Sequence, residues 1–187
     1  VTYQTAFLKY YYPVEYMAAL MTSVIDKPTK VAEYIQVCRQ MNIPILPPDI
    51  NKGEYGFSVS GGSILYALSA IKSVGRPVIE AIVAERKEHG EYLSVKNFIE
   101  RNMEAVNKRA IENFIKAGAL DCLEGNRHQK MVVFGQIVDD ISRNKKQSMA
   151  GQLSLFDIAS EDEKKEFEIR MPNLEEYDKE TVLSYEK

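Results

Sequence analysis

The chain has 187 residues, 24 basic and 27 acidic side chains, a formal charge of −3 and 45% hydrophobic residues. These values are ordinary for a globular protein and exclude a collagen, a coiled-coil rod and a wholly disordered chain. No apolar stretch approaches the roughly 20 residues that a membrane-spanning helix needs. The first residues lack both Met and a signal-peptide pattern, and the last ones end abruptly. We therefore interpret the chain as a cytoplasmic fragment of a longer protein, with no membrane partner.

Charge is unevenly distributed along the chain. Residues 1–60 are neutral, residues 61–148 carry a net charge of +3, and residues 149–187 carry −6. A basic middle part suits a polyanionic partner, although +3 is a weak signal by itself. The acidic end, with few apolar residues, is typical of a flexible, solvated segment.

Cysteine and histidine usage argues against a metal or catalytic centre. Cys38 and Cys122 both lie in apolar stripes, so we expect two buried free thiols in a reducing compartment. The histidines have no Cys or His at ligand spacing, and the common phosphate-loop, hydrolase and zinc-protease motifs are absent. The sequence therefore predicts no catalytic residue, no metal ligand and no cofactor in this fragment.

The first part of the chain predicts a helix in two pieces between Tyr3 and Val24. Pro13 interrupts it and suits the first position of the second piece. Tyr10, Tyr11 and Tyr12 flank this break. A stacking platform for nucleic-acid bases is one interpretation of these rings, but packing is more common, and we favour packing.

A compact mixed segment follows. Asp26–Thr29 indicates a helix entrance, and the helix is expected to end near Met41. Ile43–Leu46 predicts a short extended strand, and Pro47–Asn51 an ordered turn, because two prolines fix φ there. Apolar runs flanking Gly61-Gly62 predict a β-hairpin.

The most informative local pattern is helix, Gly-containing hairpin, helix. A short helix is expected over Ala67–Lys72, a tight turn over Ser73–Pro77, and an amphipathic helix from Val78 to about His89. Gly75 is expected to adopt backbone dihedrals or a close approach that other residues cannot. Pro77 preorganises the first turn of the second helix.

This hairpin is a candidate phosphate site. N–H groups of a first helical turn point outward, where the polarity of the helix favours an anion. Such a site holds DNA without reading its sequence. The candidate DNA-binding residues here are Lys72, Ser73, Val74, Gly75 and Arg76. An ordinary helical corner is the alternative interpretation.

A second helical pair follows about 33 residues later. Ser94 is the expected N-cap of one helix and Asn107 of the next, which Gly118 ends. Lys108 and Arg109 stand in a first helical turn, where cations are unfavourable. Either a bound phosphate or simple solvent exposure would explain them. The two pairs predict a pseudo-repeat that grips a duplex across both strands, with Asn107, Lys108 and Arg109 as further DNA-binding candidates.

The sharpest motif is the pentapeptide Gln152-Leu153-Ser154-Leu155-Phe156, which lies where the chain turns acidic. Gln152 offers an amide donor and acceptor, and Leu155 and Phe156 are adjacent apolar anchors, with Leu153 as a third contact. A short extended peptide of this kind can bind a groove on a partner. A small hydrophobic cluster that folds back on the domain is the alternative.

These residues carry a resemblance to a family. The pentapeptide matches the consensus by which bacterial proteins bind the ring-shaped sliding clamp. The preceding stretch resembles the alpha subunit of bacterial DNA polymerase III, a C-family replicase, over roughly residues 1–157. The matching blocks are Tyr3–Lys9, Tyr12–Leu20, Ile45–Asn51, Ala70–Gly75 and Lys116–Asp121.

The resemblance implies a mainly α fold with a small β-hairpin and four parts. Residues 1–60 resemble the distal fingers, residues 61–125 a tandem helix-hairpin-helix module, residues 126–147 a further helix, and residues 148–187 the clamp-binding motif with a linker toward an OB domain. It implies duplex primer-template DNA, the sliding clamp and other replicase subunits as partners. The catalytic carboxylates of the family lie in a palm upstream of Val1, and the whole protein is expected to use magnesium. The fragment itself is expected to be inactive.

One departure from the family pattern and two alternatives remain. The second hairpin has Ala105-Val106-Asn107 where a glycine is expected, so its phosphate contact has weaker support. The first alternative is a fragment of a lesion-bypass polymerase, and the second is a non-enzymatic, clamp-associated DNA-binding adaptor. The Leu46–Asn51 and Tyr3–Ala19 blocks argue against the lesion-bypass class.

Overall fold

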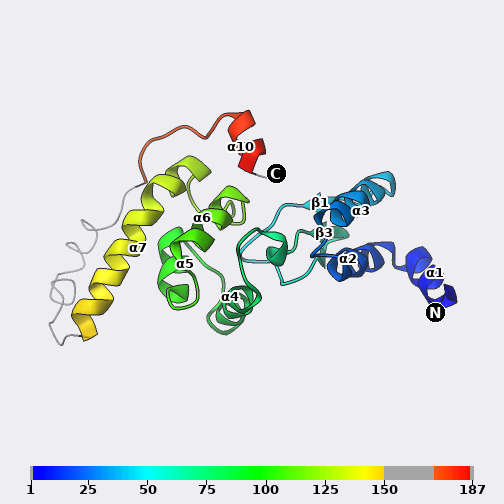
Figure 1. The fold of residues 1–187 in the computed structure, drawn as a ribbon, viewed down its shortest axis with the longest axis horizontal. Helices are drawn as coiled ribbons and strands as arrows, with labels where there is room; N and C mark the ends of the chain where they lie inside the picture. Colours follow the sequence, from blue (N-terminus) through cyan, green and yellow to red (C-terminus); the bar gives the residue numbers. More distant parts are fainter. Residues whose placement is uncertain (1, 150–170, 186–187) are drawn as a thin grey trace.

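The protein is seen in a computed structural model that describes residues 2–149 and 171–185 (Figure 1). This part of the chain is mainly helical, as expected, with eight α-helices, one 3-10 helix (η1) and a small sheet. In chain order the elements are α1 (Thr2–Tyr11), α2 (Pro13–Ser23), α3 (Pro28–Gln40), β1 (Ile45–Leu46), β2 (Ser58–Ser60), β3 (Ser63–Leu65), η1 (Leu68–Ala70), α4 (Arg76–His89), α5 (Val95–Asn102), α6 (Lys108–Lys116), α7 (Arg127–Met149) and α10 (Lys179–Tyr185). None of these helices is both long and apolar enough to cross a bilayer.

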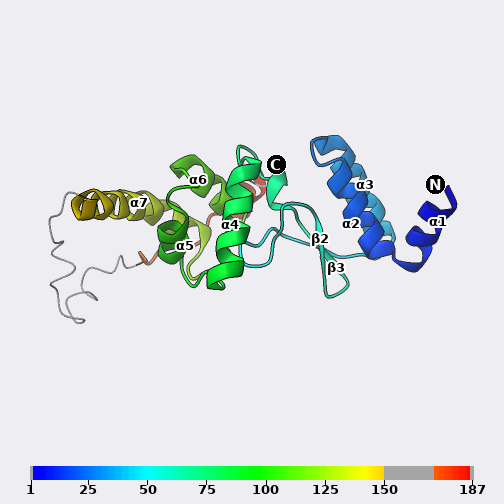
Figure 2. The ribbon, with the colours of Figure 1, turned by 90° about the horizontal axis from the view of Figure 1, so that it is seen from below.

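Two views at right angles show an elongated arrangement. Helices α1–α3 lie at one end with the sheet beside α2 and α3, and α4–α7 form the other end (Figure 1, Figure 2). Two separate clusters of buried side chains correspond to these ends.

The break between α1 and α2 confirms the expectation from Pro13. Tyr12 has φ −133° and ψ 57°, outside the helical region, because a following proline disfavours helical dihedrals. Pro13 then takes the first position of α2, where its missing N–H costs no hydrogen bond.

The packing expected for the three tyrosines is wrong. Tyr10, Tyr11 and Tyr12 are 79%, 61% and 52% exposed. The ring of Tyr11 lies 4.5 Å from that of Phe7, so the rings of α1 contact one another instead of entering a core. Helix α1 packs on α2, and none of its residues belongs to the buried cluster formed by α2, α3 and the sheet. The stacking interpretation of these rings stays a prediction.

The first core lies between α2, α3 and the sheet. Met17 and Met21 of α2 are buried at the spacing that the sequence predicts, and Cys38 of α3 places its sulfur 4.0 Å from that of Met21. The other fully buried members are Ala18, Val31, Ile43, Phe57, Ile64 and Ala67. Leu20 and Val24 are half-buried against the same cluster.

The sheet has the strand order β1-β3-β2. Strands β2 and β3 are antiparallel, and the turn between them uses Gly61 at φ 56° and Gly62 at φ 79°. Two consecutive positive φ angles give the tight hairpin turn that the Gly-Gly pair predicts. The sequence did not predict that β1 joins β3 in parallel, with Ile45 opposite Ile64.

The second core runs from η1 to α7. Its largest fully buried side chains include Tyr92, Phe98 and Phe114. The rings of Tyr92 and Phe98 are 5.1 Å apart, and those of Phe98 and Phe114 are 6.0 Å apart, both edge to face. Ile50 from the Pro-rich turn belongs to this core and is fully buried, so that turn packs with the helices that follow it.

Two buried cations hold the turn after α6. Gly118 ends this helix at φ 78°, as expected. Arg127 is 7% exposed and pairs with Asp121 at 2.8 Å. Lys130 is fully buried and donates from Nζ to the carbonyl oxygens of Leu120 and Leu123 at 2.8 and 3.0 Å. Burial lowers the pKa of the Lys130 ammonium, and the two carbonyl groups compensate its lost hydration.

Residues 171–185 pack against the start of α7 and the end of α6, which the sequence did not predict. The Glu176 carboxylate accepts the backbone N–H groups of Arg127 at 3.0 Å and His128 at 3.2 Å. Burial opposes ionisation of Glu176, but these N–H groups and that of Tyr177 outweigh it and lower its pKa. The His128 ring stacks on Tyr177 at 4.4 Å. Helix α7 is therefore capped by a carboxylate 49 residues further along the chain.

The two cysteines differ in exposure. Cys38 is a buried free thiol, as expected, and burial raises its pKa. Cys122 is free but exposed, so the expectation for it is wrong. It lies in the turn after α6 and not on an apolar helix face.

Candidate nucleic-acid interface

Two helix-hairpin units repeat with an offset of 32 residues, one fewer than the spacing read from the sequence. Helix α4 begins at Arg76 and α6 begins at Lys108. Equivalent positions are Ile71 and Met103, Val74 and Val106, Gly75 and Asn107, Ile79 and Ile111, and Ile82 and Phe114. The last residues before each helix follow the same pattern, with a buried valine and then an N-cap in extended conformation.

In hairpin 1, residues 71–75, the glycine does not have the unusual backbone conformation that the sequence analysis allowed for it. Gly75 has φ −76° and ψ 156°, which any residue adopts, whereas Ser73 has φ 62°. A Cβ atom at position 75 would meet only Cδ of Pro77, at an ordinary 3.7 Å. The left-handed residue of the turn is therefore Ser73, and Gly75 instead leaves the start of α4 open to close approach from outside.

The side chains of hairpin 1 divide into anchors and exposed groups. Ile71 and Val74 are 7% and 8% exposed and fix the turn on the second core. Lys72 and Ser73 are exposed. Arg76 is exposed as well, with its Nε 2.7 Å from a Glu80 carboxylate oxygen and its guanidinium 4.9 Å from the centre of the Tyr55 ring.

Hairpin 2, residues 103–107, has no positive φ angle and so requires no glycine. Asn107 at φ −92° caps α6, because its Oδ1 accepts the N–H of Ala110 at 2.9 Å. The N-cap that the sequence predicts is confirmed. The cap also uses one of the first-turn N–H groups, whereas Gly75 has no side chain to cap α4.

Charged residues of hairpin 2 are engaged by α7. Glu104 pairs with Lys145 at 2.6 Å, and Lys108 pairs with Asp139 at 2.6 Å. The hydrogen bond and the charge of Lys145 lower the pKa of Glu104. Arg109 is exposed. Glu104 therefore occupies the position in the second unit that Lys72 occupies in the first.

A direct hydrogen bond joins the two units. Asn113 of α6 donates from Nδ2 to the Lys72 carbonyl oxygen at 2.9 Å, across 41 residues of sequence. Since Lys72 precedes the left-handed Ser73, this bond supports the least common backbone conformation of hairpin 1.

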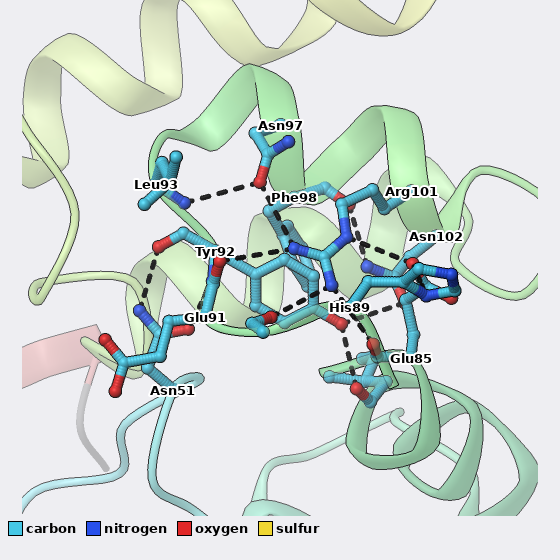
Figure 3. Close-up of polar contacts among 12 residues, drawn as sticks. Asn51, Glu85, His89, Glu91, Tyr92, Leu93, Asn97, Phe98, Arg101 and Asn102 are labelled. Atoms are coloured by element: carbon cyan, nitrogen blue, oxygen red, sulfur yellow. Dashed lines mark hydrogen bonds and ion pairs between the residues drawn. The ribbon is translucent and has the colours of Figure 1, made fainter. Parts of the chain in front are cut away.

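The connector between the units, residues 90–94, lies in a dense polar cluster with the end of α4 and with α5 (Figure 3). Arg101 of α5 donates to the Glu85 carboxylate at 3.0 Å and to the carbonyl oxygens of Glu85 and Gly90 at 3.1 and 3.0 Å. Its guanidinium also lies 4.4 Å from the centre of the Tyr92 ring. The hydrogen bond from Arg101 lowers the pKa of Glu85 although burial opposes this. Arg101 therefore holds the carboxyl end of α4 against α5.

The structure thus divides the eight residues proposed for DNA binding into two groups. Lys72, Ser73, Gly75 and Arg76 surround the start of α4, while the side chain of Val74 is buried and can present only its backbone. The remaining candidates, Asn107, Lys108 and Arg109, lie at the start of α6. The supporting residues Asn113 and Arg101 were missed, because their partners are backbone groups that no local pattern identifies.

The clamp-binding candidates Gln152, Leu153, Ser154, Leu155 and Phe156 lie outside the described residues. Within residues 2–149 and 171–185, no group of three or more His, Cys, Asp and Glu side chains is placed to hold a metal ion.

Comparison with known proteins gives consistent matches. The helix-hairpin-helix motif family matches residues 42–130. The chain is 39% identical over 173 residues to DNA polymerase III subunit alpha of Chlamydia pneumoniae, which covers 92% of the chain and 14% of that protein. It is 39% identical over 191 residues to the Thermus aquaticus subunit, covering 100% and 15%, and 40% identical over 163 residues to the Vibrio cholerae subunit, covering 86% and 14%. The chain spans about a seventh of the length of these relatives.

Proposed function

The chain is homologous over nearly its whole length to one segment of DNA polymerase III subunit alpha and contains a helix-hairpin-helix motif, and on this premise we propose that it holds duplex DNA by the phosphate backbone. The observation that carries the proposal is the open start of α4. There, a helix N-terminus that has no side-chain cap lies beside two exposed cations, Lys72 and Arg76. Helix polarity and positive charge both favour a phosphate at this place.

Binding of this kind is independent of DNA sequence and sensitive to salt. Phosphate contacts release counterions, so affinity falls steeply as salt rises. Few phosphates are engaged and the chain is acidic overall, so we expect a dissociation constant of about 1 μM or weaker at physiological salt. Weak contact is sufficient if the rest of the protein and its partners keep the DNA nearby.

Fluorescence anisotropy with two duplexes of unrelated sequence tests this proposal. We expect equal affinity for both duplexes at low salt and a weaker complex for Lys72→Glu, because the substitution reverses a charge beside the phosphate. Lys30→Glu is the matched control, since Lys30 is also exposed but lies on α3, away from both hairpins. Equal affinities of the wild type and Lys72→Glu would contradict the assignment to hairpin 1.

The second part of the proposal concerns the sliding clamp. The support is the pentapeptide Gln152–Phe156 itself, with an amide followed by two adjacent apolar anchors. A single peptide that must be ordered on binding is expected to bind in about the micromolar range. Together the two contacts would couple the grip on DNA to tethering by a ring that is threaded on it.

Calorimetry against the bacterial clamp tests the second part. Leu155→Ala combined with Phe156→Ala is expected to abolish binding, because the anchors fill the partner's pocket. Gln152→Ala is expected to cost about 1–2 kcal/mol through an unpaired polar group. A double alanine variant of undiminished affinity would show that the pentapeptide is only a packing cluster.

The third part of the proposal concerns chemistry. The whole protein is proposed to be a magnesium-using, cytoplasmic, DNA-directed DNA polymerase that works with other replicase subunits, whereas this segment contributes no catalytic residue. In the proposed layout, residues 1–60 are distal fingers, residues 61–125 the DNA-binding module, residues 126–147 a further helix, and residues 148–187 the clamp-binding motif and linker toward an OB domain. Primer extension with dNTPs and magnesium is expected to yield no product, and extension that persists after removal of contaminating polymerase would contradict this.

A further inference from the structure

We propose that residues 49–55, here called the strap, hold the two hairpins in one fixed geometry, so that both engage the same duplex, with Asn51 as the main positioning residue. The inference rests on the proposed DNA binding and adds residues that do not touch DNA. The strap lies between β1 and β2 in sequence, yet it bonds to both helix-hairpin units and to the connector between them.

The strap first binds the elements that flank hairpin 1. The N–H groups of Leu68 and Ser69, in η1, donate to the carbonyl oxygens of Glu54 and Tyr55 at 3.1 and 3.3 Å. On the other side of the hairpin, the buried Arg86 of α4 is 8% exposed. It donates from Nη1 to the carbonyl oxygens of Ile50 and Gly53, both at 2.9 Å, and pairs with Glu54 at 3.1 Å.

The strap then binds the connector and the second unit. The Asn51 side chain pairs with both backbone groups of Tyr92: its Oδ1 accepts the Tyr92 N–H at 2.8 Å, and its Nδ2 donates to the Tyr92 carbonyl at 2.9 Å (Figure 3). Ile50 donates its N–H to the carbonyl of Ala119, in the turn after α6, at 2.8 Å. One short loop therefore contacts η1, α4, the connector and the turn that follows α6.

The strap also has hydrogen bonds and close contacts of its own. The Asp49 carboxylate accepts the N–H groups of Asn51 and Lys52 at 2.7 and 3.1 Å, which fixes the turn locally. At Gly53 the chain passes so close to its neighbours that a Cβ atom would lie 2.6 Å from the Asp49 carbonyl oxygen and 2.9 Å from a Leu68 side-chain carbon. Loosening one hydrogen bond of such a loop is expected to disturb the geometry between the units more than the fold of either unit.

Fixed geometry matters because each hairpin alone offers few contacts. When one hairpin is bound, a rigid partner hairpin meets the DNA as an intramolecular step, which raises its effective concentration. When the position of one hairpin relative to the other varies, this effective concentration falls. Fewer phosphates are then engaged at one time. The number of phosphates engaged is read from the slope of log affinity against log salt concentration.

The test compares Asn51→Leu with Asn126→Leu in the whole 187-residue chain. Asn126 is the matched control, because it also holds backbone through its amide, donating to the Leu174 carbonyl and accepting the Gln129 N–H, both at 2.8 Å. Neither residue lies in a hairpin. Asn51→Asp is the second variant and keeps the acceptor for the Tyr92 N–H while removing the donor. Thermal unfolding, anisotropy and the salt slope are measured for each protein.

We expect Asn51→Leu to weaken duplex binding by on the order of tenfold and to reduce the salt slope by about one for each phosphate that is no longer engaged. Asn51→Asp is expected to show a smaller change in the same direction. Asn126→Leu is expected to lower the melting temperature while the slope stays at the wild-type value.

Equal slopes for wild type, Asn51→Leu and Asn51→Asp would overturn the inference, as would an equal decrease of the slope in Asn126→Leu. The proposed function fails differently: in that case the wild type itself shows no salt-dependent binding, or Lys72→Glu has no effect.

Discussion

The two hairpins have the same scaffold and opposite charge at one exposed position of the tip. Val74 and Val106 are buried at equivalent positions, and each is followed by an extended N-cap. At the exposed tip, however, hairpin 1 has Lys72 and hairpin 2 has Glu104. The buried positions of the repeat therefore preserve its shape, whereas we expect the exposed positions to set the strength of a phosphate contact.

The two hairpins are also held in place by different kinds of contact. Hairpin 2 is held by ion pairs to α7, since Lys145 engages Glu104 and Asp139 engages Lys108. Hairpin 1 is held through its main chain, by the hydrogen bond from Asn113 to the Lys72 carbonyl. Because the tip of hairpin 1 is basic and that of hairpin 2 acidic, we expect hairpin 1 to be the stronger DNA contact and hairpin 2 the weaker one.

The largest expected effect concerns the shared scaffold. Phe114 and Ile82 occupy equivalent, fully buried positions of the two units. Phe114→Ala is expected to lower the free energy of unfolding by about 3–5 kcal/mol, and Ile82→Ala by about 2–5 kcal/mol, because apolar burial is removed and cavities are left behind. Urea denaturation followed by circular dichroism measures both. A decrease below about 1 kcal/mol for either variant would show that its unit does not depend on a packed core.

A charge reversal at hairpin 2 is expected to have the next largest effect. Glu104→Lys gives hairpin 2 the positive charge that Lys72 provides in hairpin 1. It also releases Lys145 from its ion pair. Duplex affinity at low salt is expected to rise roughly threefold, consistent with about one further phosphate being engaged. Glu33→Lys, on α3, makes the same change in net charge elsewhere and serves as the control. An increase of equal size in both variants would mean that only net charge matters.

Smaller effects on stability are expected from substitutions at Ser73 and Gly75, and they should differ between these two residues of hairpin 1. Ser73 holds φ 62° and Gly75 φ −76°. Ser73→Gly is therefore expected to raise the free energy of unfolding by roughly 1 kcal/mol, because it removes strain at a left-handed position. Gly75→Ala is expected to keep stability or raise it by about 0.4–1 kcal/mol and to weaken DNA binding, since a methyl group then stands at the open start of α4. Thermal unfolding measures the stability of each variant, and anisotropy measures its DNA binding. Destabilisation by Gly75→Ala would contradict the assignment of Ser73 as the left-handed residue of the turn.

The smallest effect is a pH dependence at the tip of hairpin 2. Lys145 lowers the pKa of Glu104 below its usual 4.5. The ion pair therefore contributes above the unfolded-state pKa, and its contribution is lost as pH falls through the lowered folded-state value. Because both groups are exposed, the change in stability is expected to be slight. Carboxyl carbon NMR titration, repeated in Lys145→Gln, checks the direction: the pKa of Glu104 should move up toward 4.5 in the variant.

Local signals in the sequence were sufficient for the helix ends and turns. Pro13, the Gly61-Gly62 pair and the N-cap Asn107 each act on their own backbone, and each is found where it was expected. The mainly helical fold was expected from the family resemblance, and the regular apolar spacing of the predicted helices agrees with it. Such signals depend on residues that are close together in the chain.

Features that depend on distant partners were not predictable in the same way. The left-handed residue of hairpin 1 is Ser73 and not the nearby glycine, and the residue before it is held by Asn113 from 41 residues away. The role of Asn51 depends on Tyr92, which also lies 41 residues along the chain from its partner. A turn-like sequence such as Pro47–Asn51 therefore identified an ordered loop without revealing what it joins.

Backbone amide NMR of the whole chain, titrated with a short duplex, tests the inequality of the hairpins most directly. We predict that the largest shift changes lie at Lys72–Arg76 and smaller ones at Asn107–Arg109, while α2 and α3 stay unchanged. Largest changes at hairpin 2, or in α2 and α3, would contradict the account.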